Sequence, residues 1–209
     1  MRMKRFFVFL MAATIGCASM TAHAASKDSG HWQDKRSTLQ ISAGYISGFW
    51  AAKQLVAWIP AAAGHSREWK FYGNYGLQYY YQTNWWCRVG AKAVYELDGY
   101  KLYTSQKEDG VMKGFCTNHT FTLMPSVQFT YLNLPFVQLY SGLDVGASAY
   151  LRHTRYEPGY SGEENNLVWL FALNITPIGV SFGSWPVYGF VETNLGYDAV
   201  VKAGLGVHF

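Results

Sequence analysis

Charged side chains are scarce in this chain of 209 residues: 14% of its residues are Asp, Glu, Lys or Arg, whereas 18% are aromatic. A disordered chain has the opposite composition, so intrinsic disorder is excluded. The formal net charge is +4, but Arg2, Lys4 and Arg5 belong to the first 24 residues, which contain no Asp or Glu. Without those three, 14 of the 17 basic residues stand against 13 acidic ones, a net charge of +1, and we expect no nucleic-acid partner.

Long apolar runs are missing as well. After residue 24, no stretch reaches the roughly 18 apolar residues that a transmembrane helix needs, which excludes an α-helical membrane protein. Residues 1–24 have the layout of a secretory signal peptide, with a cationic start, an apolar run from Phe6 to about Ile15, and small residues at Ala22 and Ala24. We expect cleavage after Ala24 and a short periplasmic segment over residues 25–37. The alternative is lipidation at Cys17, because Thr14–Cys17 is a degenerate lipobox.

Alternation between apolar and polar residues, with a period of two, dominates the rest of the chain. In Val137–Arg152, one face carries only apolar residues and Ser141, while the other carries polar residues such as Gln138, Asp144 and Arg152. Such a pattern is typical of a β-strand whose two faces meet different surroundings. The same pattern predicts eight strands: Thr38–Trp50, Trp69–Gln82, Trp86–Tyr103, His119–Leu132, Val137–Arg152, Leu167–Thr176, Val187–Tyr197 and Val200–Phe209.

The connections between these strands alternate in length. Three are long (51–66, 104–118 and 153–166), two are short (83–85 and 133–135), residues 177–186 form an intermediate one, and residues 198–199 form a tight turn. Long and short connections alternate in outer-membrane barrels. The strands of soluble β-sandwiches also alternate between apolar and polar residues, but they average about 5–6 residues and lack aromatic belts. We therefore predict an eight-stranded antiparallel transmembrane β-barrel, an up-and-down meander, over residues 38–209.

Two mature cysteines remain, Cys87 and Cys116. An exported pair forms a disulfide by default. The predicted strands place the two cysteines at opposite ends of one hairpin, with Cys87 facing about Tyr131. A disulfide needs Cα atoms within roughly 7 Å, so we predict two free thiols.

The ending Ala203–Phe209, AGLGVHF, resembles the C-terminal signal of Gram-negative outer-membrane barrels. The stretch Thr176–Gly183, followed by Val187–Gly196, is similar to the closing hairpins of small barrels common in Bacteroidota. The resemblance implies an outer-membrane location. An even number of strands with the N-terminus in the periplasm predicts that the long loops are extracellular. The resemblance also implies that Leu205, Val207 and Phe209 form the signal for the barrel-assembly machinery. It adds no catalytic residue.

The predicted inward faces carry charges. Eight strands leave an interior only wide enough for side chains, and a buried charge needs a partner. The residues are five basic and three acidic: Lys70, Arg88, Lys92, Arg152, Lys202, Glu96, Asp144 and Glu192. We predict a side-chain-filled lumen of ion pairs; the alternative is a narrow ion path with a slight anion preference.

These observations favour a non-enzymatic outer-membrane protein, structural or surface-interacting, with no cofactor and no metal. Its expected neighbours are outer-membrane lipid and lipopolysaccharide. One alternative is a narrow channel or small-solute carrier. A second is an outer-leaflet lipid-modifying enzyme, which would need His153 with Ser148 or Ser161 and Glu157. A third is a zinc site, which would need His65, His119 and His153 to converge.

Overall fold

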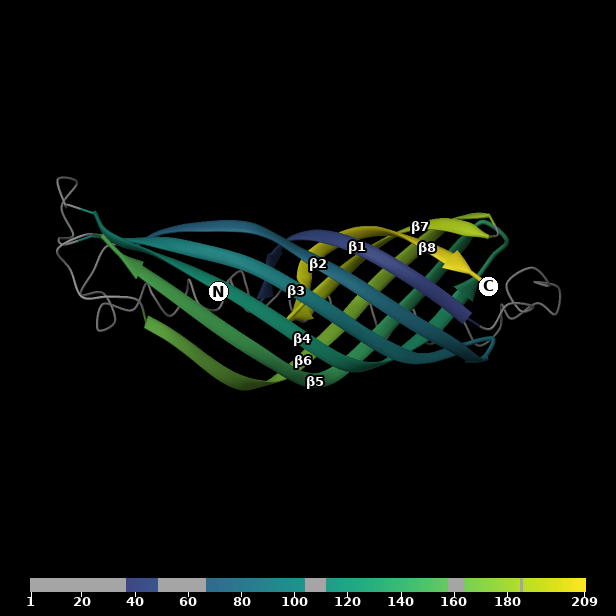
Figure 1. Ribbon diagram of the computed structural model, residues 1–209. Helices are drawn as coiled ribbons and strands as arrows, with labels where there is room; N and C mark the ends of the chain where they lie inside the picture. Colours follow the sequence, from purple (N-terminus) through teal and green to yellow (C-terminus); the bar gives the residue numbers. More distant parts are fainter. Residues whose placement is uncertain (1–36, 49–66, 104–111, 158–163, 185) are drawn as a thin grey trace, which may run out of the picture.

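The computed structural model describes residues 37–48, 67–103, 112–157, 164–184 and 186–209 (Figure 1). These residues form eight strands: β1 (Ser37–Ser47), β2 (Arg67–Asn84), β3 (Cys87–Tyr103), β4 (Met112–Asn133), β5 (Val137–Tyr156), β6 (Glu164–Ser184), β7 (Val187–Gly196) and β8 (Ala199–His208). Each strand pairs antiparallel with its neighbours in sequence, and β1 pairs with β8. The predicted eight-stranded up-and-down barrel is confirmed. The predicted signal peptide lies outside the described residues.

The two ends of the described chain close the barrel at one point. The amide of Ser37 donates to the carbonyl of Phe209 at 3.2 Å, and the amide of Phe209 donates to the carbonyl of Ser37 at 2.9 Å. Both ends therefore lie at the end of the barrel that carries the short turns, on the right in Figure 1. The connections 48–66, 104–111 and 157–163 leave from the opposite end.

Strands continue through several residues that were assigned to connections, and the two largest differences are at the start of β4 and the end of β6. Strand β4 begins at Met112 rather than His119, and β6 runs on to Ser184 rather than Thr176, so residues 177–186 are not an intermediate connection. Proline lacks an amide hydrogen and usually interrupts a strand. Pro177 is tolerated because the pairing of β6 with β7 skips from Ile175 to Ile178, which places the proline in a bulge.

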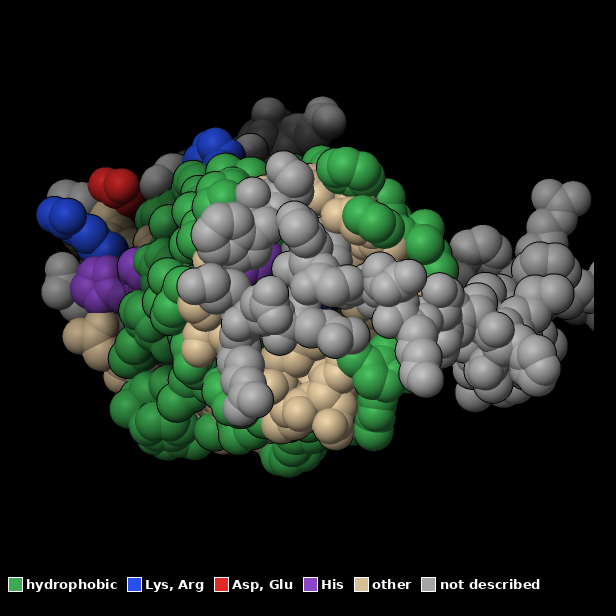
Figure 2. Space-filling view, turned by 90° about the vertical axis from the view of Figure 1, so that its right-hand side faces the viewer, with side chains coloured by type: hydrophobic (Ala, Val, Ile, Leu, Met, Phe, Trp, Pro, Cys, Tyr) green, Lys and Arg blue, Asp and Glu red, His purple; other side chains and the backbone are tan. Residues whose placement is uncertain are grey.

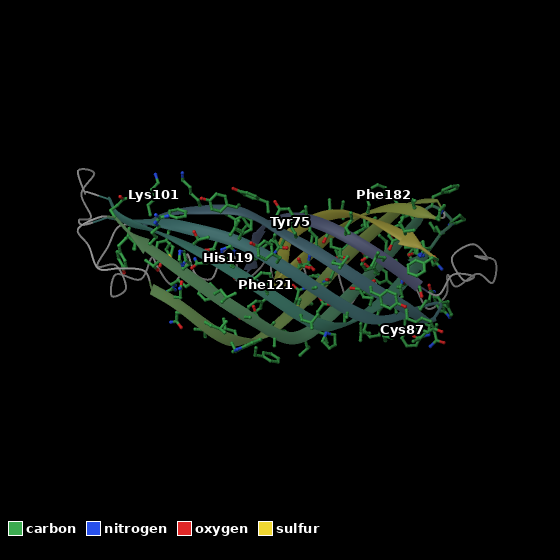
Figure 3. All side chains as sticks on the ribbon, in the orientation of Figure 1. Tyr75, Cys87, Lys101, His119, Phe121 and Phe182 are labelled. Atoms are coloured by element: carbon green, nitrogen blue, oxygen red, sulfur yellow. The ribbon has the colours of Figure 1, made fainter. Side chains whose placement is uncertain are left out.

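The outside of the barrel is apolar. Outward side chains include Ile41 at 58% exposed, Leu123 at 62% and Phe171 at 69%. Figure 2, seen from the end with the short turns, shows hydrophobic side chains around the periphery. Exposed aromatic residues accompany this band, with Phe182 near the short turns and Tyr75 near the middle of the barrel (Figure 3). An exposed apolar band rich in aromatic residues is typical of the exterior of a barrel that crosses a lipid bilayer.

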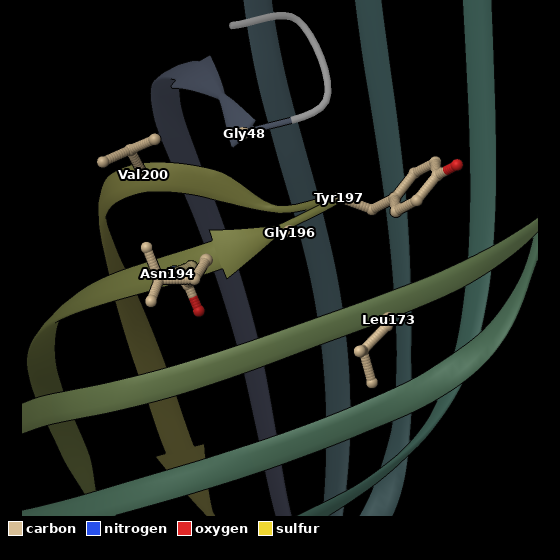
Figure 4. A pocket seen from close by; sticks show the side chains of 7 residues that line it. Gly48, Leu173, Asn194, Gly196, Tyr197 and Val200 are labelled. Atoms are coloured by element: carbon tan, nitrogen blue, oxygen red, sulfur yellow. The ribbon is translucent and has the colours of Figure 1, made fainter. Parts of the chain in front are cut away.

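The wall of the barrel has two heights. Strands β1, β7 and β8 have 11, 10 and 10 residues, whereas β2–β6 have 17 to 22. Figure 1 shows β2–β6 extending well beyond the other three toward the long connections. The pairing of β6 with β7 stops at Asn174 and Gly196, so Glu164–Leu173 continues past the top of β7. A pocket of ≈ 310 Å³ lies at this step, between Gly48, Leu173, Tyr197 and Val200 (Figure 4).

Both described cysteines are free thiols, as predicted. Cys87 pairs in register with Phe129, and Cys116 pairs with Tyr100, thirteen positions further along β3. In the described part of the chain, no helix has the length and apolarity needed to cross a membrane.

Candidate functional site

The barrel lumen contains a cluster of five buried charges, which we call the lumen cluster: Lys92, Asp144, Glu192, Asp198 and Lys202. None of their side chains is more than 1% exposed. Lys92 Nζ lies 2.6 Å from Asp144 Oδ2 and 3.2 Å from Asp198 Oδ2. Lys202 Nζ lies 2.5 Å from the same Asp198 oxygen and 2.9 Å from Glu192 Oε2. Asp198 thus joins both lysines into one network across the lumen.

Neutral donors complete the coordination of these carboxylates. Asp144 accepts from Ser126 Oγ and, at 2.7 Å, from Asn174 Nδ2. Glu192 Oε1 accepts from the hydroxyl of Tyr140 at 2.8 Å. Asp198 Oδ1 accepts from the amide of Ala199 at 2.8 Å. Each carboxylate therefore has both a cation and a neutral donor, which offsets the cost of removing its charge from water.

Strand register places these groups. Glu192 and Lys202 stand directly opposite each other on β7 and β8, and Asp144 stands opposite both Ser126 and Asn174. Residues that stand directly opposite each other on neighbouring strands lie on the same face of the sheet. If one of them points into the lumen, its cross-strand partners point into the lumen as well. Lys92 lies on β3 and reaches β5 and the β7–β8 turn. The cluster therefore links strands from both sides of the barrel.

Two further acids extend the polar interior from the cluster toward the long connections. Asp98 accepts from Asn118 Nδ2 at 2.8 Å, and Glu96 accepts from Asn74 Nδ2 at 3.5 Å. Both acids are at most 2% exposed. On the other side of the cluster, Arg88 donates to Gln138 Oε1 and lies over the ring of Tyr140, with 5.9 Å from Cζ to the ring centroid.

Aromatic rings fill the lumen near the short turns. Tyr188 stacks on His208 with 4.5 Å between centroids, and its hydroxyl accepts from Gln40 Nε2 at 2.6 Å. Tyr188 and Phe190 stand directly opposite Gly206 and Gly204 of β8. A Cβ at either glycine would overlap the opposing ring, so the alternate glycines of the C-terminal strand give these rings their room.

The structure buries six of the eight predicted lumen charges in the interior and leaves two exposed: buried are Arg88, Lys92, Glu96, Asp144, Glu192 and Lys202; exposed are Lys70 and Arg152. The prediction for Lys70 was wrong because a bulge between Phe71 and Gly73 reverses the alternation. Phe71 pairs with inward Asp98, which puts Lys70 outside. Arg152 keeps inward register opposite Asn118, but its side chain is exposed above the ring of Tyr150, 5.6 Å from the centroid.

Sequence reasoning missed two lumen acids, Asp98 and Asp198. Asp98 has the same parity as Glu96, so the alternation of β3 could have found it. Asp198 was assigned to an external tight turn. The turn instead lies at the level of the cluster, because β7 and β8 are short. Among the described residues, the buried ionisable charges are therefore five acidic and three basic, which reverses the predicted excess of cations.

The residues of the catalytic and zinc alternatives are dispersed. Ser148 is buried on the inward face and bonded to Thr122 Oγ1 at 2.9 Å, whereas His153, five residues later, has outward register. His153 Nδ1 lies 2.6 Å from Asn165 Oδ1, and His119 Nδ1 lies 2.9 Å from the hydroxyl of Tyr95. Ser161 and His65 lie outside the described residues. Within the described ranges, no group of three His, Cys, Asp or Glu side chains is placed to bind a metal ion.

The three residues of the predicted assembly signal lie on the outer surface of β8 and at its end. Leu205, Val207 and Phe209 are 57%, 42% and 56% exposed. On the other face of the strand, Gly204 and Gly206 stand opposite the lumen rings of Phe190 and Tyr188. The C-terminal pattern thus has one apolar exterior face and one interior face on which two glycines precede the buried His208.

Comparisons with known proteins concern the fold. No family model matches the chain, and no curated protein matches its sequence. A similar solved structure is the N-terminal β-barrel domain of OprF from Pseudomonas aeruginosa, 10% identical, covering 84% of this chain and 98% of that one, with a TM-score of 0.41. Another is Ail, the attachment invasion locus protein of Yersinia pestis, 12% identical, covering 84% and 99%, with a TM-score of 0.43. Ail in complex with the heparin analogue sucrose octasulfate is 14% identical, covering 83% and 98%, also at 0.43.

Proposed function

We propose that the chain is a non-enzymatic outer-membrane barrel protein whose lumen is closed by its own side chains, with a structural or surface-interacting role. The observation that carries this proposal is the burial of the lumen cluster, where no side chain is more than 1% exposed. An open, water-filled path through the barrel would leave these charged groups exposed, because water solvates charged groups better than any others. Ion pairs and hydrogen bonds occupy the place that a channel would leave to water.

The location and orientation follow from the exterior and from the chain ends. The apolar band suits a bilayer, and closed barrels without lipid-exposed strand edges are the β-structures that can cross one. Both ends of the described chain lie beside the short turns, which for an exported chain supports an orientation with those turns in the periplasm and the long connections outside. Outer-membrane lipid and lipopolysaccharide are then its immediate partners.

Conductance of planar lipid bilayers tests the closed lumen. We expect the refolded chain to leave the current at background in concentrated KCl, because each carboxylate of the lumen cluster is paired with a lysine in the interior. Heat-dependent mobility on a gel, measured on the same preparation, establishes that the barrel is folded. Discrete conductance steps would contradict the proposal. If Lys202→Gln then changed the ion selectivity of those steps, the narrow-channel alternative would replace it.

A non-enzymatic role is supported by the separation of Ser148 and His153 on opposite faces of β5. Lipid A and phospholipid profiles of cells with and without the gene test it. We expect the two sets of profiles to be identical. A lipid species that disappears on deletion and returns with the wild-type gene would support the lipid-modifying alternative instead.

The C-terminal strand is proposed to engage the barrel-assembly machinery through its exposed face. Phe209→Ser is expected to remove most of the protein from outer-membrane fractions, because it replaces the terminal aromatic side chain. Phe182→Ser is the matched control, since Phe182 is 51% exposed near the same end of the barrel (Figure 3). Immunoblots of membrane fractions measure both. Equal losses for the two variants would mean that Phe209 acts only as a lipid-facing side chain.

A further inference from the structure

The exterior of β2–β6 is hollowed by an apolar groove of ≈ 640 Å³, which we call the exterior groove. Its floor contains the small residues Ala93 and Ala147, and its walls include Tyr75, Phe121, Leu123 and Trp169. The pairing register of the strands explains the shape of the groove. Leu123 stands between Ala93 and Ala147 on neighbouring strands, while Tyr75, Tyr95 and Phe121 follow one another in the adjacent row. Large side chains therefore rise beside small ones on one continuous outward surface.

Cations lie on the same strands, on the side of the groove that faces the long connections. Lys70 and Arg155 are exposed and Lys101 is partly exposed. Lys101 follows Tyr95 by six residues on β3, and Arg155 follows Ala149 by six on β5. His119, bonded to Tyr95, lies between the two levels. Figure 3 shows Lys101, His119 and Phe121 in this order from the end with the long connections.

The distance along the barrel axis between the groove and the cations fits the depth of one leaflet of a bilayer. Six residues extend about 20 Å along a strand, or roughly 15 Å along the axis of a barrel with ordinary strand tilt. The hydrocarbon of one leaflet is about 15 Å deep, half of a core of about 30 Å. A lipid whose acyl chains occupy the groove therefore has its headgroup at the level of Lys70, Lys101 and Arg155.

The distribution of charge indicates what that headgroup carries. Among the residues whose side-chain burial is described, the exposed or partly exposed Lys and Arg side chains are Lys70, Lys101, Arg152 and Arg155, all in the extended parts of β2, β3 and β5. Lys101 and Arg155 both have outward register, with Phe115 of β4 between them. Two strand spacings, about 10 Å, thus separate two cations above one apolar groove. Lys70 on β2 stands opposite Gly99, the outward residue two positions before Lys101, and adds an exposed third cation at the same end of the groove.

We propose that the exterior groove and the cations above it form a binding site for one lipid A molecule, with acyl chains in the groove and its two phosphates near Lys70, Lys101 and Arg155. This inference rests on the proposed outer-membrane location with the long connections outside. It goes beyond general contact with lipid because it names one face of the barrel. The opposite face of the barrel wall, formed by β7, β8 and β1, contributes no residue to the groove.

Native mass spectrometry of the refolded full barrel in zwitterionic micelles tests the site, with lipid A, monophosphoryl lipid A and phosphatidylglycerol as probes. We expect one tightly bound lipid A per barrel, and weaker binding of the two probes that have a single phosphate. Lys70→Gln and Arg155→Gln are each expected to weaken lipid A binding about fivefold. Glu157→Gln is the matched control, since it neutralises an exposed charge of the opposite sign beside Arg155 and should weaken nothing.

The groove is tested separately by filling it. Ala147→Phe is expected to weaken lipid A binding about tenfold, because the ring displaces the equivalent of one or two methylene groups. Ala203→Phe is the control, since Ala203 is an exposed alanine of β8 outside the groove. Equal binding of all three probes, or equal effects of the two phenylalanine variants, would overturn the site. So would dimers that Ala147→Phe abolishes, because the groove would then seat a second copy.

The same preparation separates failure of the site from failure of the proposed function. A barrel that shows the heat-dependent gel shift, inserts into bilayers without conductance and fails to prefer lipid A contradicts the site alone. A chain that shows no such shift and stays dispersed without detergent contradicts the membrane location, and the site with it.

Discussion

Replacing Lys92 with Met is expected to lower the free energy of unfolding of the barrel by about 3–5 kcal/mol, the usual cost of breaking one side of a buried ion pair. Lys92 is the only lumen-cluster cation in contact with Asp144, at 2.6 Å, and it also lies 3.2 Å from Asp198. Methionine preserves the apolar stem and removes the charge. Asp144 would then keep only its neutral donors, Ser126 and Asn174, in a place that water does not reach.

Urea unfolding in detergent micelles, followed by β-type circular dichroism, measures this loss. The matched control is Lys70→Met, which removes an exposed lysine and should change the free energy of unfolding by no more than about 1 kcal/mol. The double variant Lys92→Met with Asp144→Leu should recover much of the loss, because it removes the stranded carboxylate as well. If Lys92→Met and Lys70→Met had equal effects, the lumen would be hydrated and the closed-lumen proposal would fail with it.

Alternation along a strand predicts much of the lumen because side-chain direction is a local property. Once Arg88 is assigned to the inside of β3, Lys92 and Glu96 must follow at intervals of four, and each is buried. The same rule would have added Asp98. It holds only while the backbone stays regular, and it fails at the bulge before Gly73, which has a positive φ of 146°. Glycine at position 73 is a weak signal for a bulge, since most glycines within the described strands have ordinary φ.

The height of a residue along the barrel axis is not a local property. Asp198 follows a strand and precedes a strand, as a residue of an exposed hairpin turn does. Its burial depends on how far the neighbouring β6 extends past Asn174, and pairing register alone determines that. Pro177 similarly reads as the end of a strand, and only its position in a bulge allows β6 to continue to Ser184. The burial of Asp198 and the continuation of β6 past Pro177 therefore depend on the pairing register of the whole barrel. The residue pattern along a single strand did not predict them.

The second large effect is expected from a single methyl group at Gly206. A Cβ there would overlap the ring of Tyr188, which is held between the hydrogen bond from Gln40 and the stacked ring of His208. Moving the ring would break one or both contacts inside a filled lumen. We therefore expect Gly206→Ala to lower the free energy of unfolding by about 1–3 kcal/mol, the usual cost of overpacking.

Gly142→Ala provides the matched control for the same chemical change. Gly142 is also buried within a strand, but the nearest atom to its Cβ position is the carbonyl oxygen of Val127 at 3.4 Å, an ordinary contact. Alanine should be tolerated there, or slightly stabilising, because glycine weakens a strand interior. A second variant, Gly206→Ala with Tyr188→Leu, should regain stability relative to Gly206→Ala alone if the overlap with the ring is the cause. Equal stability of the two single variants in urea would instead mean that the C-terminal glycines are not needed to seat the lumen rings. The pattern Gly204–Gly206 would then have to be explained by the requirements of membrane assembly alone.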